Sequence, residues 1–565
     1  MFIYSMNILQ KIIKQLIKGN PQTARDIADL KRQASADFKL PASSNMDLLK
    51  AYHQLLKKKK IKKNKSLELL LRKREIRTLS GVAPIAVLTK PYPCPGQCVY
   101  CPTEKAMPKS YLSNEPAVMR AVLCDFDPYK QVKVRLDALR IEGHDTDKIE
   151  LIVMGGTWSF LPKDYQVWFI SECFRACNSP RHSERSEESR GKQKATLQAL
   201  RRQQKTNETA KHRIIGLTLE TRPDYINPEE VRWMRELGCT RVELGVQAIS
   251  DSILQLCQRG HKVKEIVEAT KLLKDAGFKI SYHLMPNLPG STPAKDVQMF
   301  KKLFTNPNFQ PDMIKIYPCV VTKDAKLYNW WKQGKYKPYT DKQLLEALIK
   351  IKTHLPYYVR VTRLIRDIPN ESIVAGNRIS NLREYLRREM DKRGLTCKCI
   401  RCREIGHQRD NLKSKILNLK FFSTKYKASG GMEYFLSYES PDRKILYAFL
   451  RLRIPDFSRG IPSRANLKNY SNVFESLFEY SIPELSGAAI IRELHTYGHL
   501  IPISQKQKGA TQHFGLGKQL MTKAEKIVKK LKIKRLAIIS GIGVREYYKK
   551  LGYRLEGTYM VKNIK

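Results

Sequence analysis

Residues 81–102, GVAPIAVLTKPYPCPGQCVYCP, join an apolar run to a loop that carries three cysteines, Cys94, Cys98 and Cys101. The run predicts a strand, and the prolines and glycine between the cysteines predict a loop directly after it. Thiolates at the spacing C-x3-C-x2-C can hold zinc or an iron–sulfur cluster. Because a closed structural zinc site needs four ligands, three cysteines favour a centre with an open position, such as a four-iron four-sulfur (4Fe-4S) cluster. A zinc site completed by a distant fourth ligand is the alternative.

Short β-branched runs follow this loop and alternate with helical patterns. They lie at 149–156, 212–221, 240–249, 278–286 and 313–321. Strands that alternate with helices predict parallel βα units, and this many units predict an α/β barrel or partial barrel over residues 81–395. Barrel active sites lie on the loops that follow the strands. The cysteine loop and the residues at the strand ends are therefore expected to meet at one end of the barrel.

Several polar side chains and one pair of glycines occur at these predicted strand ends. Gly155 and Gly156, after the second strand, let the backbone approach a ligand closely. The polar candidates are Glu220, Arg222, Gln247, His283 and Lys315, with Arg259 and His261 in the segment RGH. Such residues suit a pocket that positions a substrate and excludes water. Each could instead be a polar residue of the barrel interior with a structural role.

A second cysteine cluster, CKCIRC, provides Cys397, Cys399 and Cys402. The tight spacing C-x-C-x2-C suits a structural zinc ion that holds two domains together, with a fourth ligand that the sequence does not identify. We therefore place a zinc-binding linker at 396–420. Strand patterns return beyond this linker and predict a separate α+β domain over 421–565.

A glycine-rich stretch in the last domain, TQHFGLGKQLM, places Gln512, Gly515 and Gly517 as Q-x-x-G-x-G immediately before a predicted helix. Glycines let the backbone approach a ligand, and the free N–H groups at a helix start favour an anion, so a pyrophosphate fits there. Taken alone the pattern is weak, because glycine-rich helix starts are common. With one strand before it and another after it, the stretch resembles the acetyl-coenzyme A site of GNAT acetyltransferases.

The charge balance points to a polyanionic partner. The chain has 104 Lys and Arg residues against 54 Asp and Glu residues, a net charge of +50, and nucleic acid is the leading partner for such a surface. Residues 1–80 are predicted to be a basic helical region that binds the phosphates of a nucleic acid. Its candidates for phosphate contact are Lys57, Lys58, Lys59, Lys60, Lys62, Lys63, Arg72 and Arg74. The alternatives are a solvated lysine face or a proteome-wide excess of lysine.

The sequence predicts neither a membrane span nor a secretion signal. No stretch approaches 18 uninterrupted apolar residues, the length at which a membrane helix becomes a candidate. Lysines interrupt the N-terminal apolar stripe, and a small-residue cleavage site is missing. A cytoplasmic location is therefore expected.

One segment interrupts the barrel pattern. Residues 178–211 are charged, low in complexity and without apolar periodicity. This composition predicts a surface insertion that is disordered at its Ser/Glu/Arg-rich start.

Six stretches, taken in order, resemble the radical S-adenosylmethionine domain of the catalytic subunit of Elongator. This family is the tRNA uridine(34) acetyltransferase, or carboxymethyluridine synthase. The stretches are CPGQCVYCP, MGGTWSFLPKDY, GLTLETRPDYINPEE, CTRVELGVQ, RGHKV and KIYPCVV. The resemblance runs from about residue 80 to the end of the chain and includes ISGIGVREYYKKLGY in the last domain. The cysteine spacing is that of bacterial and archaeal members.

The resemblance implies roles for individual residues. It implies a 4Fe-4S cluster on the cysteines of the first loop, with S-adenosylmethionine near Gly155, Gly156, Arg259 and His261. It implies contact with the cofactor for Glu220 and Gln247, which are candidate catalytic residues together with His283, Lys163 and Tyr317. It implies contacts with acetyl-CoA for Gln512, His513, Phe514, Gly515, Leu516, Gly517, Tyr547 and Tyr548. For the two tyrosines, aromatic packing of an amphipathic helix is the alternative.

The resemblance also implies a reaction. A 5′-deoxyadenosyl radical would abstract a hydrogen from the acetyl methyl group, and the carbon radical would add to the wobble uridine of a tRNA anticodon. Hydrolysis of the thioester would then leave 5-carboxymethyluridine. The implied partners are tRNA, acetyl-CoA and an electron donor for the cluster, with a monomer or homodimer that needs no accessory subunit. The alternative function is a protein lysine acetyltransferase with a structural cysteine domain and Glu493 as general base.

Overall fold

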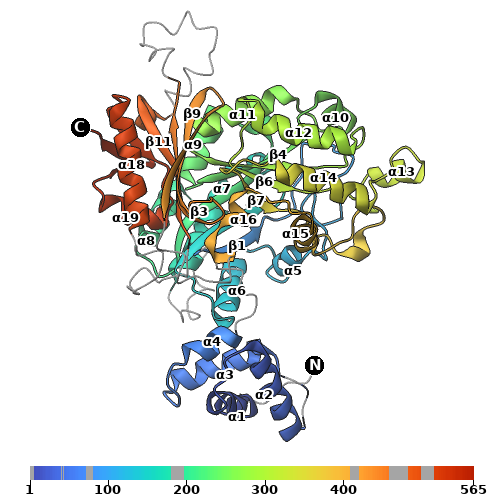
Figure 1. Ribbon diagram of the computed structural model, residues 1–565, viewed down its shortest axis with the longest axis vertical. Helices are drawn as coiled ribbons and strands as arrows, with labels where there is room; N and C mark the ends of the chain where they lie inside the picture. The colour runs from blue at the N-terminus through green and yellow to red at the C-terminus, as the bar shows by residue number, and fades with distance from the viewer. Residues whose placement is uncertain are drawn as a thin grey trace, which may run out of the picture.

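The computed structural model describes residues 6–39, 41, 43–71, 81–179, 196–407, 419–456, 482–497 and 515–565. Figure 1 shows three parts along the chain: a small helical unit at the N-terminus, a sheet surrounded by helices, and a C-terminal sheet packed against that second part. Within these residues, no helix combines the length and the apolar character that crossing a membrane requires.

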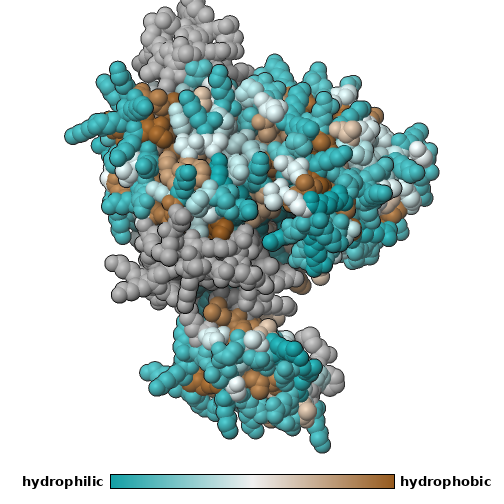
Figure 2. Space-filling model, in the orientation of Figure 1, coloured by the Kyte–Doolittle hydropathy of each residue, from teal (hydrophilic) through white to brown (hydrophobic). Residues whose placement is uncertain are grey.

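The N-terminal unit consists of four helices with their own core. They are α1 (Met6–Lys18), α2 (Ala24–Asp37), α3 (Asn45–Lys57) and α4 (Lys65–Leu71). The apolar stripe of α1, with Leu9, Ile13 and Leu16 fully buried, packs in one cluster with Leu48 and Tyr52 of α3. The unit projects from the rest of the chain in Figure 1, and its surface in Figure 2 is mainly hydrophilic. Residues 6–71, where the structure describes them, therefore form a folded helical unit that carries Lys57–Lys63.

The second part is a sheet of seven parallel strands that lie in the order of the chain. They are β1 (Ala83–Leu88), β2 (Lys148–Met154), β3 (Arg213–Thr221), β4 (Arg241–Gln247), β5 (Lys279–Leu284), β6 (Met313–Ile316) and β7 (Arg360–Arg363). Because β1 and β7 are the two edges of this sheet, the barrel is partial, as the sequence predicts. All strands are parallel, so their carboxyl ends lie at one edge of the sheet.

Helices follow the strands and cover the sheet (Figure 1). They are α5 (Pro116–Val122), α6 (Pro128–Ile141), α7 (Lys163–Asn178), α8 (Leu197–Asn207), α9 (Pro228–Glu236), α10 (Asp251–Leu256), α11 (Val263–Asp275), α12 (Pro293–Thr305), α13 (Leu327–Lys332), α14 (Asp341–Thr353), α15 (Leu382–Lys392) and α16 (Ile400–Arg403). Several begin as their sequences predict: the Asn227 side chain accepts a hydrogen bond from the backbone N–H of Glu230, with Pro228 as the first residue of α9.

The structure corrects the prediction for residues 178–211. Only 180–195 lie outside the described residues, and the second half of the segment forms α8, which packs on α7. Leu200 is fully buried, and the buried Asn207 side chain donates to His212 O at 3.0 Å. The sequence gives little sign of this helix because polar residues fill most of its buried face. The second half of the expected insertion is therefore part of the barrel domain.

The third part is a mixed sheet of seven strands in the order β13-β14-β12-β11-β10-β9-β8. The strands are β8 (Lys420–Ala428), β9 (Gly431–Glu439), β10 (Leu446–Ile454), β11 (Ala488–Thr496), β12 (Arg535–Ile538), β13 (Arg554–Glu556) and β14 (Tyr559–Asn563), with helices α18 (Leu516–Lys530) and α19 (Arg545–Lys549). Only β11 and β12 pair in parallel, and they do so over Ala488–Ile491 and Arg535–Ile538. The last residues of β11 therefore extend past β12.

The two sheets share one continuous hydrophobic core. Glycines permit the closest approach: a Cβ added to Gly541 would lie 2.0 Å from the carbonyl oxygen of Ile215 in β3. The hydroxyl of Tyr559 in β14 donates to Ala276 O at 2.8 Å, next to the end of α11. The C-terminal sheet therefore packs directly on the barrel through buried contacts.

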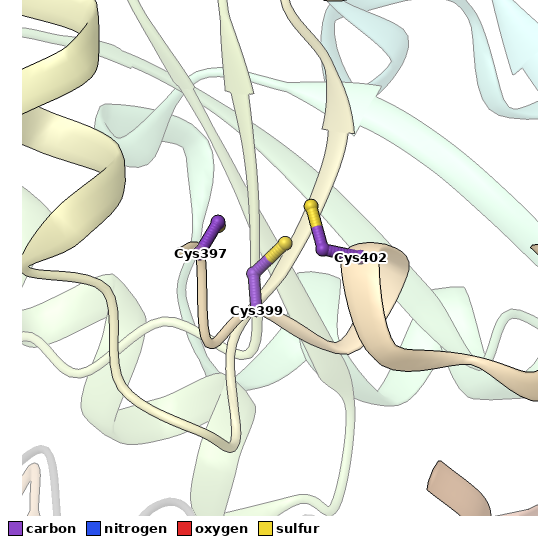
Figure 3. Close-up of side chains that lie close together, drawn as sticks. All are labelled: Cys397, Cys399 and Cys402. Atoms are coloured by element: carbon purple, nitrogen blue, oxygen red, sulfur yellow. The ribbon is translucent and has the colours of Figure 1, made fainter. Parts of the chain in front are cut away.

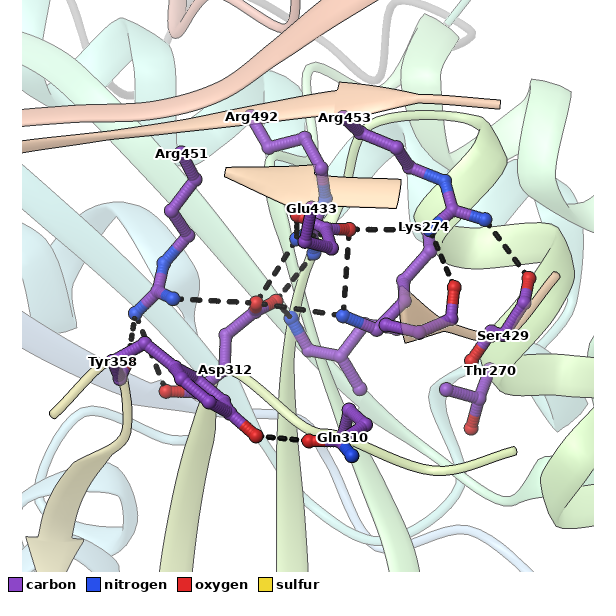
Figure 4. A network of polar contacts seen from close by, with 12 residues as sticks. Thr270, Lys274, Gln310, Asp312, Tyr358, Ser429, Glu433, Arg451, Arg453 and Arg492 are labelled. Carbon is purple, nitrogen blue, oxygen red and sulfur yellow. Dashed lines mark hydrogen bonds and ion pairs between the residues drawn. The ribbon is translucent and has the colours of Figure 1, made fainter. Parts of the chain in front are cut away.

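A buried ion network also crosses this interface (Figure 4). Arg492 of β11 donates to Asp312 Oδ1, just before β6, and to Glu433 Oε2 of β9, both at 3.0 Å. The ammonium of Lys274, in α11, lies 3.6 Å from a carboxylate oxygen of each acid. All four side chains have 0% exposure, so no solvent screens these charges. Each charge depends on the others for compensation.

Candidate active site

The three cysteines of the first loop lie at the carboxyl end of β1. Cys98 is buried, and Arg259 Nη1 donates to its sulfur at 3.4 Å, while Arg259 Nη2 donates to Gly245 O at 2.6 Å. Burial raises the pKa of the Cys98 thiol, but the charges of Arg259 and Arg222, with hydrogen bonds from Arg259 and Tyr100, together lower the pKa overall. The backbone N–H of Gly96 lies 3.5 Å from the sulfur of Cys94. The loop therefore presents thiols in a positively charged setting.

The spacing of these sulfurs separates the two metal readings. Four thiolates around one zinc ion lie about 3.8 Å apart, because each Zn–S bond is about 2.3 Å long. Among the described residues, the sets of three or more ligand-type side chains with ligand atoms within 4.8 Å of one another do not include Cys94, Cys98 and Cys101. At least two of these sulfurs therefore lie more than 4.8 Å apart, which is wider than thiolates on one zinc ion and compatible with a multi-iron cluster.

Two buried arginines face this loop. Arg222 donates to Asp224 through Nε at 2.9 Å and Nη2 at 2.7 Å, but its buried Nη1 has no hydrogen-bond partner in the described part of the chain. A Cβ added to Gly96 would lie 2.3 Å from that Nη1, so the free donor points at the cysteine loop. The Nε of Arg259 is likewise buried and has no hydrogen-bond partner among the described residues. Buried donors of this kind fit an anionic group, such as a thiolate-bound cluster or a carboxylate.

His261 lies beside the two arginines. Its side chain has 0% exposure, with Nδ1 3.6 Å from Asp224 Oδ1, and neither ring nitrogen has a hydrogen-bond partner among the described residues. Burial and the charge of Arg259 lower the pKa of His261 to about 3. The imidazole is therefore neutral at physiological pH and can accept or donate a hydrogen bond.

The glycine pair after β2 forms one wall of a small hollow. Gly155 has φ +131°, and a Cβ there would lie 2.0 Å from Thr89 Oγ1, so only glycine fits. The hollow is lined by Thr89, Val153, Met154, Gly155, Gly156, Trp158, Leu161 and Glu220. The indole N–H of Trp158 is buried and, within the described residues, unpartnered. Gly155 thus packs its backbone on Thr89, whereas a Cβ on Gly156 would meet Lys109 O only at 3.7 Å, and the close approach of a ligand to this glycine pair stays a prediction.

Four charged side chains from successive strands meet inside the barrel, and we call them the barrel cluster: Glu220 of β3, Glu243 of β4, His283 of β5 and Lys315 of β6. His283 Nε2 lies 3.0 Å from Glu243 and 3.9 Å from Glu220. The Lys315 ammonium pairs with Glu243 and lies 3.5 Å from Glu220. Burial raises the pKa of Glu243, but Lys315 and His283 outweigh it and hold the pKa well below its ordinary value. Because Lys315 supplies the cation, this cluster needs no metal ion.

Two tyrosines connect the barrel cluster with its surroundings. The hydroxyl of Tyr111, in the cysteine loop, donates to Glu220 Oε2 at 2.9 Å. Tyr317 follows β6, and its ring packs edge-on against His283 with centroids 5.5 Å apart. Glu220 also lines the hollow at the glycine pair. One carboxylate therefore joins the cysteine loop, the glycine pair and the barrel cluster.

Other predicted residues lie outside this cluster. Gln247 ends β4 with φ +67°, uncommon for a side chain other than glycine, and its carbonyl accepts from the N–H of Met285. Lys163 pairs with Glu230, and its ammonium lies over the Trp233 ring with its side chain 51% exposed. Its role stays a prediction, since it does not reach the barrel cluster.

The expectation that site residues lie at the ends of strands did not identify Glu243 or Tyr111. Glu243 faces Glu220 directly in the β3–β4 register. The stretch CTRVELGVQ contains it, but the sequence alone does not identify which strand residue faces that carboxylate. Tyr111 lies in an irregular loop, where no periodicity marks it.

The second cysteine set brings its three sulfurs together. Cys397, Cys399 and Cys402 have sulfurs within 4.8 Å of one another, and Figure 3 shows them on one short turn around α16. The ammonium of Lys352, 2% exposed, lies 3.6 Å from Cys402 Sγ. The backbone N–H of Ile400 donates to Val359 O at 2.8 Å, just before β7. The set therefore lies where the barrel passes into the linker.

In the C-terminal sheet, the helix start and one of the two predicted tyrosines come together. Gly515 precedes α18 with φ +66°, and a Cβ on Gly517 would lie 3.1 Å from the hydroxyl of Tyr547 and 3.7 Å from Thr496 of β11. Tyr547 is 39% exposed, whereas Tyr548 is 7% exposed and packs in the core. Packing is thus the observed role of Tyr548. Leu516 is buried as the first residue of α18, and Gln512, His513 and Phe514 lie outside the described residues.

The predicted phosphate-binding lysines share one exposed connection. Lys57, Lys58, Lys59, Lys60, Lys62 and Lys63 are all exposed between α3 and α4. Arg72 and Arg74 lie outside the described residues. The lysines are therefore free of the core and available to an anionic surface.

Comparison with known proteins gives family models that match the barrel domain and relatives that match nearly the whole chain. Residues 92–303 match the model of the radical SAM superfamily and residues 311–392 that of the radical SAM C-terminal domain. The chain is 42% identical to the tRNA uridine(34) acetyltransferase of Methanocaldococcus infernus, covering 99% of this chain and 98% of that protein. It is 36% identical to human Elongator complex protein 3, covering 98% and 96%. A solved structure of the archaeal M. infernus Elp3, lacking residues 1–46 of its N-terminus, superimposes with a TM-score of 0.68 at 42% identity, covering 86% of this chain and 99% of that one.

Proposed function

Because the chain belongs to the family of Elp3-type tRNA uridine(34) acetyltransferases with a radical S-adenosylmethionine domain, we propose that it forms 5-carboxymethyluridine at the wobble position of tRNA from acetyl-CoA. The observation that carries this proposal is the placement of Glu220. Its carboxylate links the cysteine loop, through Tyr111, to the glycine pair and to the barrel cluster. One end of the barrel thus brings together a loop with three thiols, a glycine pair and fixed charges.

The residues at the barrel end suit the cofactors that this family implies. Cys94, Cys98 and Cys101 would hold the 4Fe-4S cluster, and Arg222 and Arg259 would offset its negative charge. When bound, the cluster and S-adenosylmethionine supply one-electron chemistry that can break a C–H bond of the acetyl group. The protein's own contribution is to orient the reactants and exclude water. Buried donors and a packed barrel interior support that role.

The barrel cluster orients what enters the barrel. Glu243 is 2% exposed at its side chain and stays ionised, so it holds Lys315 and His283 in place. Glu220 has 12% of its side chain exposed and can accept a hydrogen bond from a bound molecule. Fixed hydrogen-bond partners of this kind position a substrate without reorganisation during reaction.

Acetyl-CoA fits the start of α18 in this proposal. Backbone N–H groups at the start of a 15-residue helix favour a pyrophosphate. Gly517 keeps the space beside Tyr547 open, and the end of β11 extends past β12 next to it. These features support acetyl-CoA bound against β11, on the sheet that packs on the barrel.

The geometry gives less support to a protein lysine acetyltransferase. Its general base would be Glu493, which accepts a hydrogen bond from Arg451 at 2.9 Å and lies 3.9 Å from Lys279. Burial raises the pKa of Glu493, but Lys279 and Arg451 outweigh it and lower the pKa. A carboxylate whose pKa is lowered is a weaker base for a lysine ammonium than an ordinary glutamate.

Zinc is the ion that we propose for Cys397, Cys399 and Cys402. Three thiolates within 4.8 Å of one another suit tetrahedral coordination, with the fourth ligand unidentified. Its place between the barrel and the linker suggests a structural role. Metal analysis of the protein purified without chelators should find close to one zinc per chain, and its absence would reject the assignment.

We propose that tRNA contacts the lysines between α3 and α4. Reversing the charge of Lys58, Lys59 and Lys60 should weaken tRNA binding by about tenfold or more and make it less dependent on salt, because fewer counterions are released. The measurement is a titration of labelled tRNA at several salt concentrations. The triple variant Lys526→Glu, Lys529→Glu and Lys530→Glu in α18 is the control. Equal losses in both variants would mean that only net charge matters.

The proposed function is tested with reconstituted protein under anaerobic conditions. Incubation with tRNA, acetyl-CoA, S-adenosylmethionine and a chemical reductant should give carboxymethyluridine, detected by nucleoside mass spectrometry. Omission of any one component should remove the product. Acetylated lysine peptides formed in its place would favour the alternative enzyme class. The physiological electron donor, the oligomeric state and a cytoplasmic setting stay predictions.

A further inference from the structure

We propose that residues 322–338, around α13, form a docking surface for the single-stranded RNA that flanks the modified base. This inference rests on the proposed function, because it takes tRNA as the substrate. The segment follows β6 and therefore lies at the carboxyl end of the barrel. In Figure 1, α13 projects from the barrel on the side away from the C-terminal sheet.

The segment is strongly basic and its charges are exposed. It has five lysines against a single acid, Asp324, and all six side chains belong to exposed residues. The lysines are Lys323, Lys326, Lys332, Lys335 and Lys337. Such a concentration of one sign favours a polyanionic partner through release of counterions.

Aromatic rings lie among these lysines. The rings of Tyr328 and Trp331 stack at 5.9 Å with an angle of 25° between their planes, and the Lys332 ammonium lies 4.8 Å from the Tyr328 ring. Trp330 and Trp331 are half-buried, with part of each side chain in solvent. Partly exposed aromatic rings beside lysines are a combination that binds single-stranded nucleic acid, since bases stack on the rings while the phosphates meet the charges.

The segment is fixed directly to the cysteine loop. The backbone N–H of Leu327 donates to Val99 O at 2.7 Å, and that of Thr103 donates to Asp324 O at 2.9 Å. Lys326 Nζ donates to the side chain of Gln97 at 3.1 Å. The partners in the cysteine loop, Gln97, Val99 and Thr103, flank Cys98 and Cys101 in the sequence. RNA on this segment would therefore lie next to the proposed cluster.

The far end of the segment is anchored as well. The hydroxyl of Tyr336 donates to Asn287 O at 2.7 Å, after β5, and the N–H of Tyr339 donates to the Asn287 side chain at 3.0 Å. With both ends held, the rings and lysines between them form a fixed platform. An uridine that enters the barrel must leave its neighbouring nucleotides outside, and those nucleotides need stacking partners and cations at the entrance.

The experiment compares two double charge reversals in the full-length protein. Lys332→Glu with Lys335→Glu alters the α13 segment, and Lys529→Glu with Lys530→Glu makes the same change in α18, on the opposite side of Figure 1. The probe is a labelled anticodon stem-loop RNA. The α13 variant should bind it about tenfold or more weakly, with a shallower salt dependence, while the control changes by less than about twofold.

A second variant tests stacking. Tyr328→Ala should weaken binding of the stem-loop by about fivefold or more but leave binding of a blunt-ended RNA duplex unchanged, because only unpaired bases can stack on a ring. Unchanged stem-loop affinity in both α13 variants overturns the inference. The inference is also overturned if a variant keeps this affinity but accepts electrons more slowly from an acidic protein donor. In that case the surface would bind the donor and not RNA. If the unmodified protein binds no tRNA, the proposed function itself fails.

Discussion

Replacement of Cys98 by serine is expected to abolish formation of carboxymethyluridine while leaving tRNA binding intact. A serine hydroxyl does not ionise in the way that a thiol does and is a poor ligand for iron. Cys98 is 7% exposed and receives a hydrogen bond from Arg259. A water molecule or another side chain therefore cannot easily take the place of its sulfur as an iron ligand. Residues that merely support metal ligands change activity by about 10–100-fold, so loss of this ligand should exceed about 100-fold. Nucleoside mass spectrometry after anaerobic turnover measures the product.

A matched control separates loss of the cluster from loss of a buried thiol. Cys124 is 5% exposed, and it belongs to neither cysteine set. Cys124→Ser should keep both the iron content and the product, whereas Cys98→Ser should lose the visible absorption and the paramagnetic signal of the reduced cluster. If Cys98→Ser retained substantial activity, the assignment of the radical chemistry to this loop would be wrong.

The barrel could be predicted because most of its strands carry a short run of buried apolar residues. Residues 149–154, for example, carry an apolar run that matches β2 closely. The last strand was missed because its sequence, RVTR, has a single apolar residue and spans Arg360–Arg363 only. Pairing with β6 and the cover provided by the linker turn make this stretch a strand. Such tertiary support leaves no periodic pattern in the chain.

The residues of the candidate site that lie near the ends of strands could be predicted from the sequence. Glu220, His283 and Lys315 each end or nearly end a strand, so the rule for parallel barrels identifies them. Glu243 belongs to the cluster through its register with Glu220, which depends on how β3 and β4 pair. Tyr111 reaches the cluster from a loop whose path no local pattern specifies. Register and loop paths are set by packing over the whole domain.

The sequence does not show how the barrel domain and the C-terminal domain pack against each other. The sequence divides them at the second cysteine set, and it predicts two domains with a linker. The structure gives them one core, in which Gly541 contacts β3 and Tyr559 contacts the end of α11. A reaction that draws an acetyl group from one half and radical chemistry from the other requires such a fixed relation.

Substitution of Asp312 by asparagine is expected to destabilise the protein by about 3–5 kcal/mol, since it leaves buried cations without compensation. Asp312 accepts from Arg492 and from the N–H of Ile280 at 2.9 Å, and the Lys274 ammonium lies 3.6 Å away. Burial raises the pKa of Asp312, but the positive charges, Arg492 first, hold it far below its ordinary value. The contribution of Asp312 is thus present above the unfolded pKa of about 4 and declines as pH falls below it. Denaturant unfolding at neutral and acidic pH measures it.

The control for Asp312 is a solvated pair in the same domain. Asp367 pairs with Arg363 at 2.7 Å, and both side chains are nearly half exposed, so Asp367→Asn should cost less than about 1 kcal/mol. Asp312→Asn should also lower product formation below what its loss of folded protein explains, because Asp312 precedes β6, which carries Lys315, and Arg492 lies on β11 beside the proposed acetyl-CoA site. A change in stability below about 1 kcal/mol for Asp312→Asn would show that the network is not needed to hold the two halves together.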